Sequence, residues 1–478
     1  MDWLNNICWL TDSYKVSHWL QYPNVFGRRR TRRVHSYFES RSGSTFPQTV
    51  FYGLQYYCKQ YLAGQTVTKE KINQAEELFN EHFGSKVFNK DGWNYILNKH
   101  GGHLPIEIKA VPEGTTVNES NVLMTVENTD ENFSQSDTAF WLTNWLETLL
   151  TETWYPSTVA TQSFFMKKII LKYLYLTGTP ELIDYKLHDF GFRGVTCPEQ
   201  AAIGGSAHLL NFKGTDTTPG IVMARHFYHE RMAGHSIPAA EHSTITSWGK
   251  HHEIDACRNM LEKYPDGMVA VVSDSYDIFN CCENIWGGIL KDAVLARNGV
   301  LVIRPDSGHP PTVCCQLLNI LGAKFGFTVN AKGYKVLHPK VRLIQGDGID
   351  FQMLELILAA LMKDGWSADN IAFGSGGGLL QKLNRDTQKF AFKCSSIDIE
   401  EDGVLVSHDV YKQPKTDSGK RSKAGRFKLV FDDNGILITV PAIDPRPDQL
   451  QVAYRNGLIV VDQTFADIRS RIPAFVAI

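Results

Sequence analysis

Three absences narrow what this sequence can encode. No stretch among its 478 residues approaches the ~20 consecutive apolar residues that span a bilayer, so we expect no transmembrane helix. Net charge is nearly absent, at −2 from 49 basic and 51 acidic residues, which argues against a nucleic acid or an anionic membrane as the main partner. The first residues, MDWLNNICWLTDSYK, have an acid at position 2 and no basic stretch before an apolar run, so no secretory signal is expected.

Metal-binding and disulfide patterns are also missing. The nine cysteines show no C-x-x-C spacing, and the adjacent pairs Cys281–Cys282 and Cys314–Cys315 are poorly suited to bridges or metal knuckles. We therefore expect reduced thiols, mostly in cores, and a cytoplasmic protein. The stretch from His252 begins H-E-x-x-H, but Ala256 stands where the second histidine would be, which excludes that zinc motif.

What is present indicates a large globular protein of at least two domains. Hydrophobic residues make up 43% of the chain, with 26 Phe and 18 Tyr, and the length exceeds what one core usually holds. Alternating apolar residues predict strands at 34–40, 104–110 and 121–128, and two core helices are predicted within 137–177. A C-terminal hairpin is predicted with its turn at Asn434–Gly435.

From about residue 184 the pattern changes to short apolar segments that end in polar residues and are followed by longer helical stretches. This alternation predicts parallel β/α units. We expect an irregular β/α barrel at 181–390, and an α+β strand-rich domain formed by 1–180 and 391–478. The predicted barrel strands lie at 185–191, 212–216, 236–242, 268–275, 300–308, 341–348 and 370–378. Because the carboxyl ends of barrel strands form one face, their polar residues should gather there.

The last of these segments, AFGSGGG, followed by LLQKLNRD, raises the question of a phosphate site. Glycines at a strand-to-helix turn let the backbone approach an anion, and free N–H groups at a helix start attract it. The stretch fits neither G-x-x-x-x-G-K-[ST] nor G-x-G-x-x-G. A glycine turn can equally serve tight packing, so this stretch alone leaves both interpretations open.

Two strand ends carry acids beside an arginine. In RPDSG, Arg304 offers a planar fork for an oxygen anion, and Asp306 projects to the same side of an extended strand. Asp274, in SDSYD, belongs to the neighbouring segment. These groups suit a sugar polyphosphate with Mg²⁺, although an internal salt-bridge network would use the same residue types.

Two further stretches contain candidate site residues, and a third contains a run of arginines. In HDFGFRG, Phe190 can stack on a flat heteroaromatic ring while Arg193 meets a phosphate. In AAEHSTIT, His242 is either a cap residue or, oriented by Asp274, a base or phosphate acceptor. The run RRRTRR at 28–33 has five arginines, which could bind phosphates or act as a targeting patch, but a solvated loop is the favoured interpretation.

Ten of these stretches occur together in one family. The sequences TDSYKVSH, YFESR, YKLHDFGFRG, NFKGTDT, IPAAEHSTIT, VVSDSYDI, IRPDSG, IQGDG, AFGSGGGLLQKL and KRSKAGR, in this order, closely resemble the nicotinamide phosphoribosyltransferases, which are type II phosphoribosyltransferases. The resemblance covers nearly the whole chain. It implies a homodimer with shared active sites, built on an irregular α/β barrel, that joins nicotinamide to 5-phosphoribosyl-1-pyrophosphate, giving nicotinamide mononucleotide and pyrophosphate. It also implies Mg²⁺, and ATP hydrolysis through a phosphohistidine.

The resemblance assigns a role to each matching position. The pyridine ring would lie between Phe190 and Tyr14 of the partner subunit, with its amide at Asp216, and His242 would be the phosphorylated residue. Arg304 would approach the amide oxygen or the pyrophosphate, which Arg193 would also contact, while Asp274 and Asp306 would serve the ribose and Mg²⁺. The 5-phosphate cradle would comprise Gly346, Asp347, Gly376, Gly377 and Arg385. Further phosphate-lining residues would be Arg41, Lys393, Lys412 and Lys420.

Two departures and two alternatives accompany this hypothesis. Ala391 stands where the family pattern has a serine, and the run at 28–33 lies outside the pattern. The first alternative is a nicotinate phosphoribosyltransferase, which Asp216 disfavours because an ionised carboxylate repels the carboxylate of nicotinate. The second is a non-catalytic nucleotide- or pyrophosphate-binding module, for which the full set His242, Asp274, Arg304 and Asp306 would be unnecessary.

Overall fold

The computed structural model describes residues 5–25, 28–130, 138–416 and 421–474, and the chain divides into two compact units. The strand-rich unit comprises Met1–Thr161, Phe227–His229 and Asn384–Ile472. The barrel unit comprises Gln162–His226, Glu230–Leu383 and Pro473–Ile478. The N- and C-terminal segments therefore form one strand-rich α+β unit together, as predicted.

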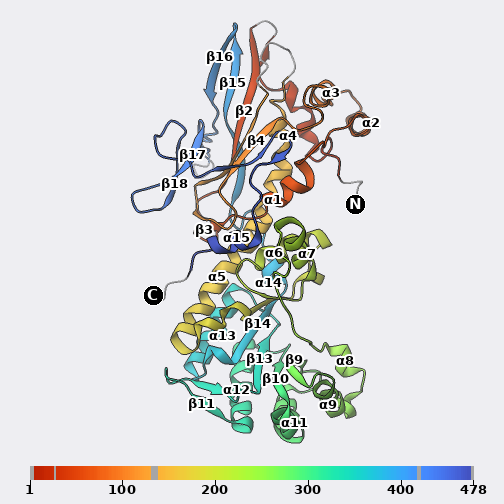
Figure 1. Ribbon diagram of the computed structural model, residues 1–478, viewed down its shortest axis with the longest axis vertical. Helices are drawn as coiled ribbons and strands as arrows, with labels where there is room; N and C mark the ends of the chain where they lie inside the picture. Colours follow the sequence, from red (N-terminus) through yellow and green to blue (C-terminus); the bar gives the residue numbers. More distant parts are fainter. Residues whose placement is uncertain (1–4, 26–27, 131–137, 417–420, 475–478) are drawn as a thin grey trace. The chain divides into compact units, whose positions relative to one another are not determined.

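The strand-rich unit is built on an antiparallel sheet whose strand order does not follow the sequence (Figure 1). Within the described residues its order is β16 (Val404–Asp409), β15 (Phe390–Glu401), β2 (Arg29–Ser40), β6 (Val122–Asn128), β4 (Ile106–Ala110), β19 (Gln451–Arg455) and β20 (Leu458–Ile459), with β1 (Asn24–Val25) added on β2. The predicted strands at 34–40, 104–110 and 121–128 are confirmed as β2, β4 and β6. The predicted hairpin is β17 (Phe427–Phe431) and β18 (Leu437–Pro441), and Gly435 at its turn has φ 74°. A short pair, β3 (Gln48–Val50) and β5 (Thr116–Asn118), completes the strands.

Helix α4 (Leu142–Thr151) covers β2, β6 and β15, which confirms the predicted helical core. Trp93, Trp141 and Trp145 pack edge to face there, with ring centroids 4.9 to 5.8 Å apart. The remaining helical elements of this unit are η2 (Ser13–Leu20), α1 (Leu54–Tyr57), η3 (Cys58–Leu62), α2 (Lys69–Phe83), α3 (Lys90–Lys99) and α15 (Phe465–Arg471). Helix α5 (Trp154–Thr177) begins in this unit, and its residues from Gln162 onward belong to the barrel unit.

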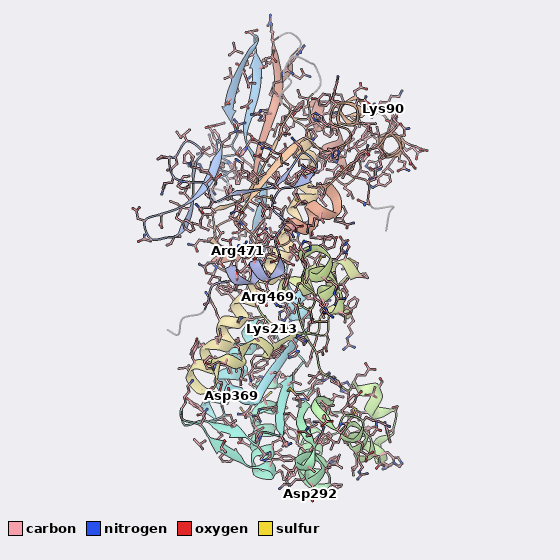
Figure 2. All side chains as sticks on the ribbon, viewed as in Figure 1. Lys90, Lys213, Asp292, Asp369, Arg469 and Arg471 are labelled. Carbon is pink, nitrogen blue, oxygen red and sulfur yellow. The ribbon has the colours of Figure 1, made fainter. Side chains whose placement is uncertain are left out.

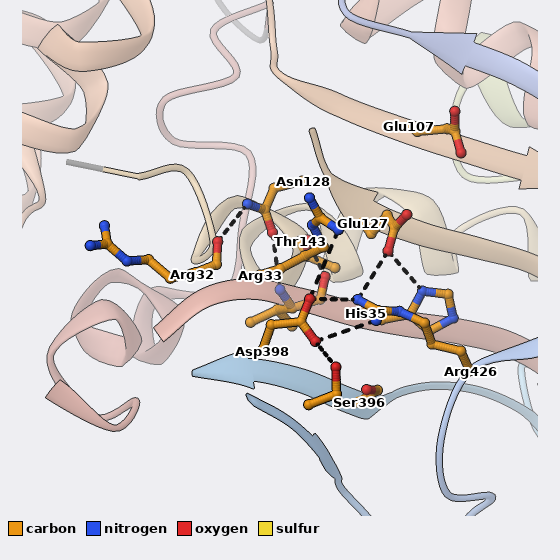
Figure 3. Close-up of polar contacts among 12 residues, drawn as sticks. Arg32, Arg33, His35, Glu107, Glu127, Asn128, Thr143, Ser396, Asp398 and Arg426 are labelled. Carbon is orange, nitrogen blue, oxygen red and sulfur yellow. Dashed lines mark hydrogen bonds and ion pairs between the residues drawn. The ribbon is translucent and has the colours of Figure 1, made fainter. Parts of the chain in front are cut away.

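The arginine run is not a solvated loop, so that prediction was wrong. From Arg29 onward the run is part of β2, whose antiparallel partner β15 carries acids in register. Arg32 is 2% exposed and pairs with Glu400. Figure 3 shows Asp398 of β15 beside Arg33 and Arg426. Strand pairing supplied carboxylates that are distant in sequence, and the run forms a structural ion-pair ladder.

The backbone carbonyl of Glu113, a residue whose carboxyl is buried, anchors the C-terminal helix of the strand-rich unit. Glu113 is 1% exposed, and its Oε1 accepts a hydrogen bond of 2.6 Å from the Gln55 backbone N–H. Arg471 of α15, labelled in Figure 2, donates to the Glu113 carbonyl at 3.0 Å and to Gln463 Oε1 at 2.8 Å. Burial raises the pKa of Glu113 to about 7, against the lowering effect of its hydrogen bonds.

The barrel unit contains a parallel sheet of consecutive β/α units (Figure 1). Its order within the described residues is β8 (Gly214–Thr215), β7 (Leu187–Asp189), β14 (Ile371–Ser375), β13 (Val341–Gln345), β10 (Asn298–Arg304) and β9 (Asp266–Val272). Six of the seven predicted barrel segments therefore contain strands. The helices that follow them include α6 (Pro198–His208), α7 (Thr218–Tyr228), α8 (His242–Thr246), α9 (Glu253–Lys263), α10 (Ile278–Asn280), η7 (Cys281–Ile289), α11 (Lys291–Ala296), α12 (Pro310–Phe325), α13 (Phe351–Lys363) and α14 (Gly377–Leu380).

The seventh segment, 236–242, is not a strand, which corrects the prediction. His235, which directly precedes it, makes an isolated parallel bridge to Gly214 of β8, and Ala239 within it makes one to Ala270 of β9. Pro238 has no N–H for a ladder, but its carbonyl accepts from the Ala270 N–H at 2.9 Å. Both edges of the sheet thus meet this segment, which closes it as an irregular barrel.

At the amino ends of these strands, a buried lysine satisfies backbone carbonyls. Lys186 Nζ donates to the carbonyls of Ala368, Asp369 and Ile371 at 2.8 to 3.1 Å (Asp369 is labelled in Figure 2). Burial lowers the pKa of Lys186 to about 7. The hydrogen bonds of Lys186 therefore stabilise this end of the barrel. No helix in the described part of the chain is long and apolar enough to cross a membrane.

Candidate functional site

A large open cavity lies over the carboxyl ends of the barrel strands. Its volume is about 1000 Å³, and its lining comes from the residues that follow β7, β8, β10, β13 and β14. The parallel arrangement brings these ends to one face although they are up to 190 residues apart in sequence. The predicted site residues that line it are Phe190, Arg193, Asp216, Arg304, Asp306, Gly346, Asp347, Gly376 and Gly377.

Beside this cavity a histidine stands between two aspartates. His242 Nε2 lies 3.0 Å from Asp274 Oδ1, and His242 Nδ1 lies 3.9 Å from Asp306 Oδ2. The geometry matches the expectation that Asp274 orients His242. The other oxygen of Asp274 accepts from the Asp306 N–H at 3.2 Å and from Ser307 Oγ at 2.6 Å. Asp274 is thus held by hydrogen bonds at both oxygens and fixes the ring plane of His242.

Asp306 has fewer partners than Asp274 and a less favourable environment for its charge. Its Oδ1 lies 4.0 Å from Arg304 Nε. Burial raises the pKa of Asp306 above its ordinary value, and the charges of Asp274 and Asp347 raise it further, while Arg304 and His242 lower it. A bound cation would relieve this accumulation of negative charge.

The carboxylates fit Mg²⁺ that is shared with a phosphorylated ligand. No group of three or more His, Cys, Asp or Glu residues that could form a metal cage occurs in the described chain. Mg²⁺ usually needs only one or two carboxylates when substrate phosphates and water complete its octahedron. Asp306 is the better ligand candidate, since both oxygens of Asp274 already accept hydrogen bonds.

The glycines of AFGSGGG divide between the two interpretations that the sequence left open. A Cβ on Gly374 would lie 1.9 Å from Phe190 Cε2, so this glycine makes room for the aromatic ring. A Cβ on Gly378 would lie 2.2 Å from the Ile349 carbonyl oxygen, so this one permits two loops to touch. Gly376 and Gly377 line the cavity. Packing and anion access are therefore both served, by different positions.

Asp216 lies where the open cavity meets a second, largely apolar one of about 280 Å³. Asp216, Phe190, Arg304 and Ala239 line both. The Asp216 backbone N–H donates to the Asp189 carbonyl at 2.9 Å, and Ser236 Oγ donates to Asp216 Oδ1. One carboxylate oxygen is thus fixed by Ser236. This arrangement suits a flat ring with a hydrogen-bond donor.

Two supporting residues of this region were given no role from the sequence, although Asp189 was among the polar residues expected at the strand ends. Ser236 precedes the IPAAEHSTIT motif by one position, and only the barrel closure brings it to Asp216. Asp189 is fully buried, its Oδ1 accepts from the Gly191 N–H at 2.7 Å, and burial raises its pKa to about 7. It shapes the turn that carries Phe190 and Arg193, and its place within HDFGFRG was the available signal.

The other predicted residues belong to the strand-rich unit. Tyr14, on η2, is 58% exposed, and Lys412 is exposed. Arg385 and Arg41 flank Lys393, and Lys15 adds a fourth cation that sequence reasoning missed within TDSYK. Burial of the Lys393 ammonium lowers its pKa, and the three other cations lower it further against Glu147. Lys420 lies outside the described residues.

Comparisons with known proteins agree on one family. Residues 185–457 match the model of the nicotinate phosphoribosyltransferase (NAPRTase) family, and residues 6–108 match that of the nicotinamide phosphoribosyltransferase N-terminal domain. A nicotinamide phosphoribosyltransferase of Xanthomonas campestris is 47% identical over 99% of both chains. Another, of Acinetobacter baylyi, is 32% identical over 96% of both.

Solved structures share the fold at low sequence identity. Human nicotinic acid phosphoribosyltransferase gives a TM-score of 0.62 at 13% identity, covering 97% of this chain and 92% of the other. Nicotinate-nucleotide pyrophosphorylase of Pyrococcus furiosus gives 0.61 at 17%, covering 98% and 95%. These likenesses support the barrel and strand-rich architecture.

Proposed function

Since the chain belongs to the nicotinate phosphoribosyltransferase (NAPRTase) family and is therefore a pentosyltransferase, we propose that it makes nicotinamide mononucleotide for NAD salvage. Its substrates are nicotinamide and 5-phosphoribosyl-1-pyrophosphate, and pyrophosphate is the second product. The relatives with sequence identities of 47% and 32% both carry the nicotinamide name, which favours this substrate. A cytoplasmic location is part of the proposal.

The observation that carries the choice of nicotinamide is Asp216 at the junction of the two cavities. Ser236 occupies one of its oxygens, and the other remains to accept an amide N–H from a ring stacked on Phe190. Nicotinate would present a carboxylate to the same group, with repulsion and no donor. A site that is built for an N–H donor discriminates strongly against an analogue that lacks it.

The reaction follows from the groups around the open cavity. The pyridine nitrogen attacks C1 of the ribose, and pyrophosphate leaves with the electron pair of the C1–O bond. Arg193 and Arg304 stabilise the charge that develops on the leaving group, and Asp306 would hold the Mg²⁺. When bound, Mg²⁺ neutralises charge on the pyrophosphate oxygens. Gly346, Asp347, Gly376 and Gly377 cradle the 5-phosphate.

ATP assistance is assigned to His242. Asp274 orients the ring through Nε2, which leaves Nδ1, on the side of Asp306, to accept a phosphoryl group. The phosphohistidine oxygens would then add to the Mg²⁺ and substrate contacts. ATP cleavage would in this way tighten substrate binding.

A homodimer completes the site in this proposal. Tyr14 of the partner subunit would cover the ring opposite Phe190, and its large exposure supports a role in an interface. The cluster of Lys393, Arg41 and Arg385 has an excess of positive charge that an anion would neutralise. Lys412 would extend this phosphate-binding surface, and Lys420, outside the described residues, keeps only the phosphate-binding role that the family resemblance implies.

The test is a turnover assay with phosphoribosyl pyrophosphate and Mg²⁺, offering nicotinamide or nicotinate with and without ATP. We expect mononucleotide from nicotinamide only, stimulated by ATP, and no stimulation in His242→Ala. In Asp216→Asn, the preference for nicotinamide over nicotinate should fall by about 100-fold, because the ionised acceptor is lost. Equal use of nicotinate by the unchanged protein would favour the nicotinate enzyme. Binding of phosphoribosyl pyrophosphate without product would favour a non-catalytic binding module.

A further inference from the structure

Two glycine-rich segments line one end of the cavity. One is the loop Gly346–Ile349 after β13, and the other is Gly376–Gly378, in which Gly376 follows β14 and Gly377 begins the four-residue α14. A cradle for a phosphate needs N–H groups held at fixed directions before the anion arrives. The question is therefore what holds these glycine-rich loops in shape.

The first loop is held from below by a buried amide. Gln345 is 1% exposed, and its Nε2 donates to the Asp347 carbonyl at 3.0 Å. Its Oε1 accepts from the thiol of Cys314 on α12 at 3.7 Å, so both ends of the amide are fixed. Neither Gln345 nor Cys314 lines the open cavity.

This contact sets the direction of the next N–H group. In a trans peptide the C=O and the following N–H point in opposite directions, so a carbonyl of Asp347 held toward Gln345 directs the Gly348 N–H away from it. Gly348 lines the cavity, and its N–H has no protein acceptor in the parts of the chain that the structure describes. The Gly348 N–H is therefore available to an anion.

A second glutamine holds the other segment by bonding carbonyls of α14, whose Leu379 N–H already donates to the Gly376 carbonyl. Gln162 of α5 is 6% exposed, and its Nε2 donates to the Gly378 carbonyl at 2.5 Å and to that of Leu379 at 3.4 Å. The two loops are also joined, because Ser375 Oγ donates to the Ile349 carbonyl at 2.7 Å. Each loop thus has a buried amide behind it and one hydroxyl between them.

We propose that Gln345 and Gln162 are positioning residues that shape the two glycine loops into one cradle for a phosphomonoester, the 5-phosphate of the ribose. This inference rests on the proposed function for the identity of the ligand. Neither side chain touches the ligand, and both act through backbone carbonyls. Loss of either donor removes the hydrogen bond that holds a backbone carbonyl, and the segment regains the freedom to turn its N–H groups out of the cavity.

The experiment replaces each donor at nearly constant volume, in Gln345→Met and Gln162→Met. The probe is ribose 5-phosphate, whose dissociation constant is measured by calorimetry and does not depend on turnover. The Michaelis constants for phosphoribosyl pyrophosphate and nicotinamide are measured beside it. The matched control is Asn370→Leu, which removes a fully buried amide from the amino end of β14, where it bonds the carbonyls of Lys335 and Ser367.

Each glutamine variant should bind ribose 5-phosphate about tenfold more weakly, the loss expected for one hydrogen bond to a charged group. The Michaelis constant for phosphoribosyl pyrophosphate should rise in parallel, and that for nicotinamide should stay within about twofold. Asn370→Leu should lower the melting temperature without weakening ribose 5-phosphate binding.

Several results separate this inference from the proposed function. Unchanged binding of ribose 5-phosphate in both glutamine variants would overturn it, even if the unchanged enzyme turns over nicotinamide. An equal loss in the Asn370→Leu control would also overturn it, because a general loss of structure would then explain the effect. If the unchanged protein binds ribose 5-phosphate but makes no mononucleotide, a selective loss in the glutamine variants supports the cradle while the proposed function fails.

Discussion

Two regions of this protein use the same residue types for opposite purposes. Along β2 and β15 of the strand-rich unit, arginines and acids pair across a sheet, and Asp398 contacts Arg33, Arg426 and Ser407. At the strand ends of the barrel unit, Asp306 has one arginine at 4.0 Å and two further carboxylates near it. The difference teaches that surplus charge beside a cavity, rather than charge itself, indicates a functional site.

The pKa values of acids in the two regions differ in the same way. Glu127, beside His35 and Arg426 in the sheet network, has a pKa lowered to about 2 by those partners although burial opposes the shift. The pKa of Asp306 is raised, because burial and like charges are not offset. Folding has satisfied the first group and left the second to a ligand.

The largest expected effect on activity is that of replacing Asp306, and its absence would contradict the comparison of the two regions. We expect Asp306→Ala to lower kcat/KM by about 1000-fold, since it removes the proposed Mg²⁺ ligand, with no loss of thermal stability. Stability should hold because the folded state already disfavours this charge. Turnover assays and melting curves measure both. Asp292→Ala, at an exposed acid of the same unit on α11, is the control and should be neutral. Equal activity of the two variants would contradict the assignment.

The second prediction, for the strand-rich unit, is the reverse of the first: stability is lost and activity is kept. Asp398→Ala should cost about 3 kcal/mol of stability, because Arg33 and Arg426 then lose a carboxylate that is buried between them. Activity per folded molecule should stay within about twofold. Chemical denaturation and turnover on the same sample test this. A large rise in a Michaelis constant without loss of stability would show that the ladder has a functional role.

The third prediction concerns the buried carboxyl of the strand-rich unit. Glu113 has a folded-state pKa of about 7, above its ordinary value of 4.5. The unfolded chain therefore releases this proton first, and the stabilisation present below pH ~4.5 is lost as pH rises toward 7. The loss should be about 3 kcal/mol across that window. Glu113→Gln should remove this part of the pH dependence in melting curves from pH 5 to 8. An unchanged slope would refute it.

The smallest expected effect on stability comes from an exposed ion pair of the same ladder. Arg29 Nη2 lies 2.6 Å from Glu401 Oε1, but the two side chains are 46% and 31% exposed. Glu401→Gln should therefore change stability by less than about 0.5 kcal/mol. Denaturation beside Asp398→Ala measures the contrast between an exposed and a buried pair. A loss as large as that of Asp398→Ala would mean that burial does not set the strength of these contacts.

Local pattern was sufficient for most elements of the fold. Alternation in 34–40 and 121–128 predicted β2 and β6, and Asn434–Gly435 predicted the hairpin turn. The repeated apolar segments with polar ends predicted the parallel units of the barrel. The segment 236–242 failed because Pro238 interrupts a ladder that the apolar pattern alone would allow. The run at 28–33 failed because its acidic partners lie some 370 residues later in the sequence.

The candidate site shows the same limit at the level of single residues. Sequence by itself determined which strand ends carry Phe190, Asp216, Asp274 and Asp306, because their motifs are local and ordered. Only the tertiary structure decided that Asp274 holds His242, that Ser236 holds Asp216, and that Gly374 serves Phe190. The physical reason is that periodicity encodes which face of an element is buried, whereas hydrogen bonds between strand ends depend on how distant segments close into a barrel.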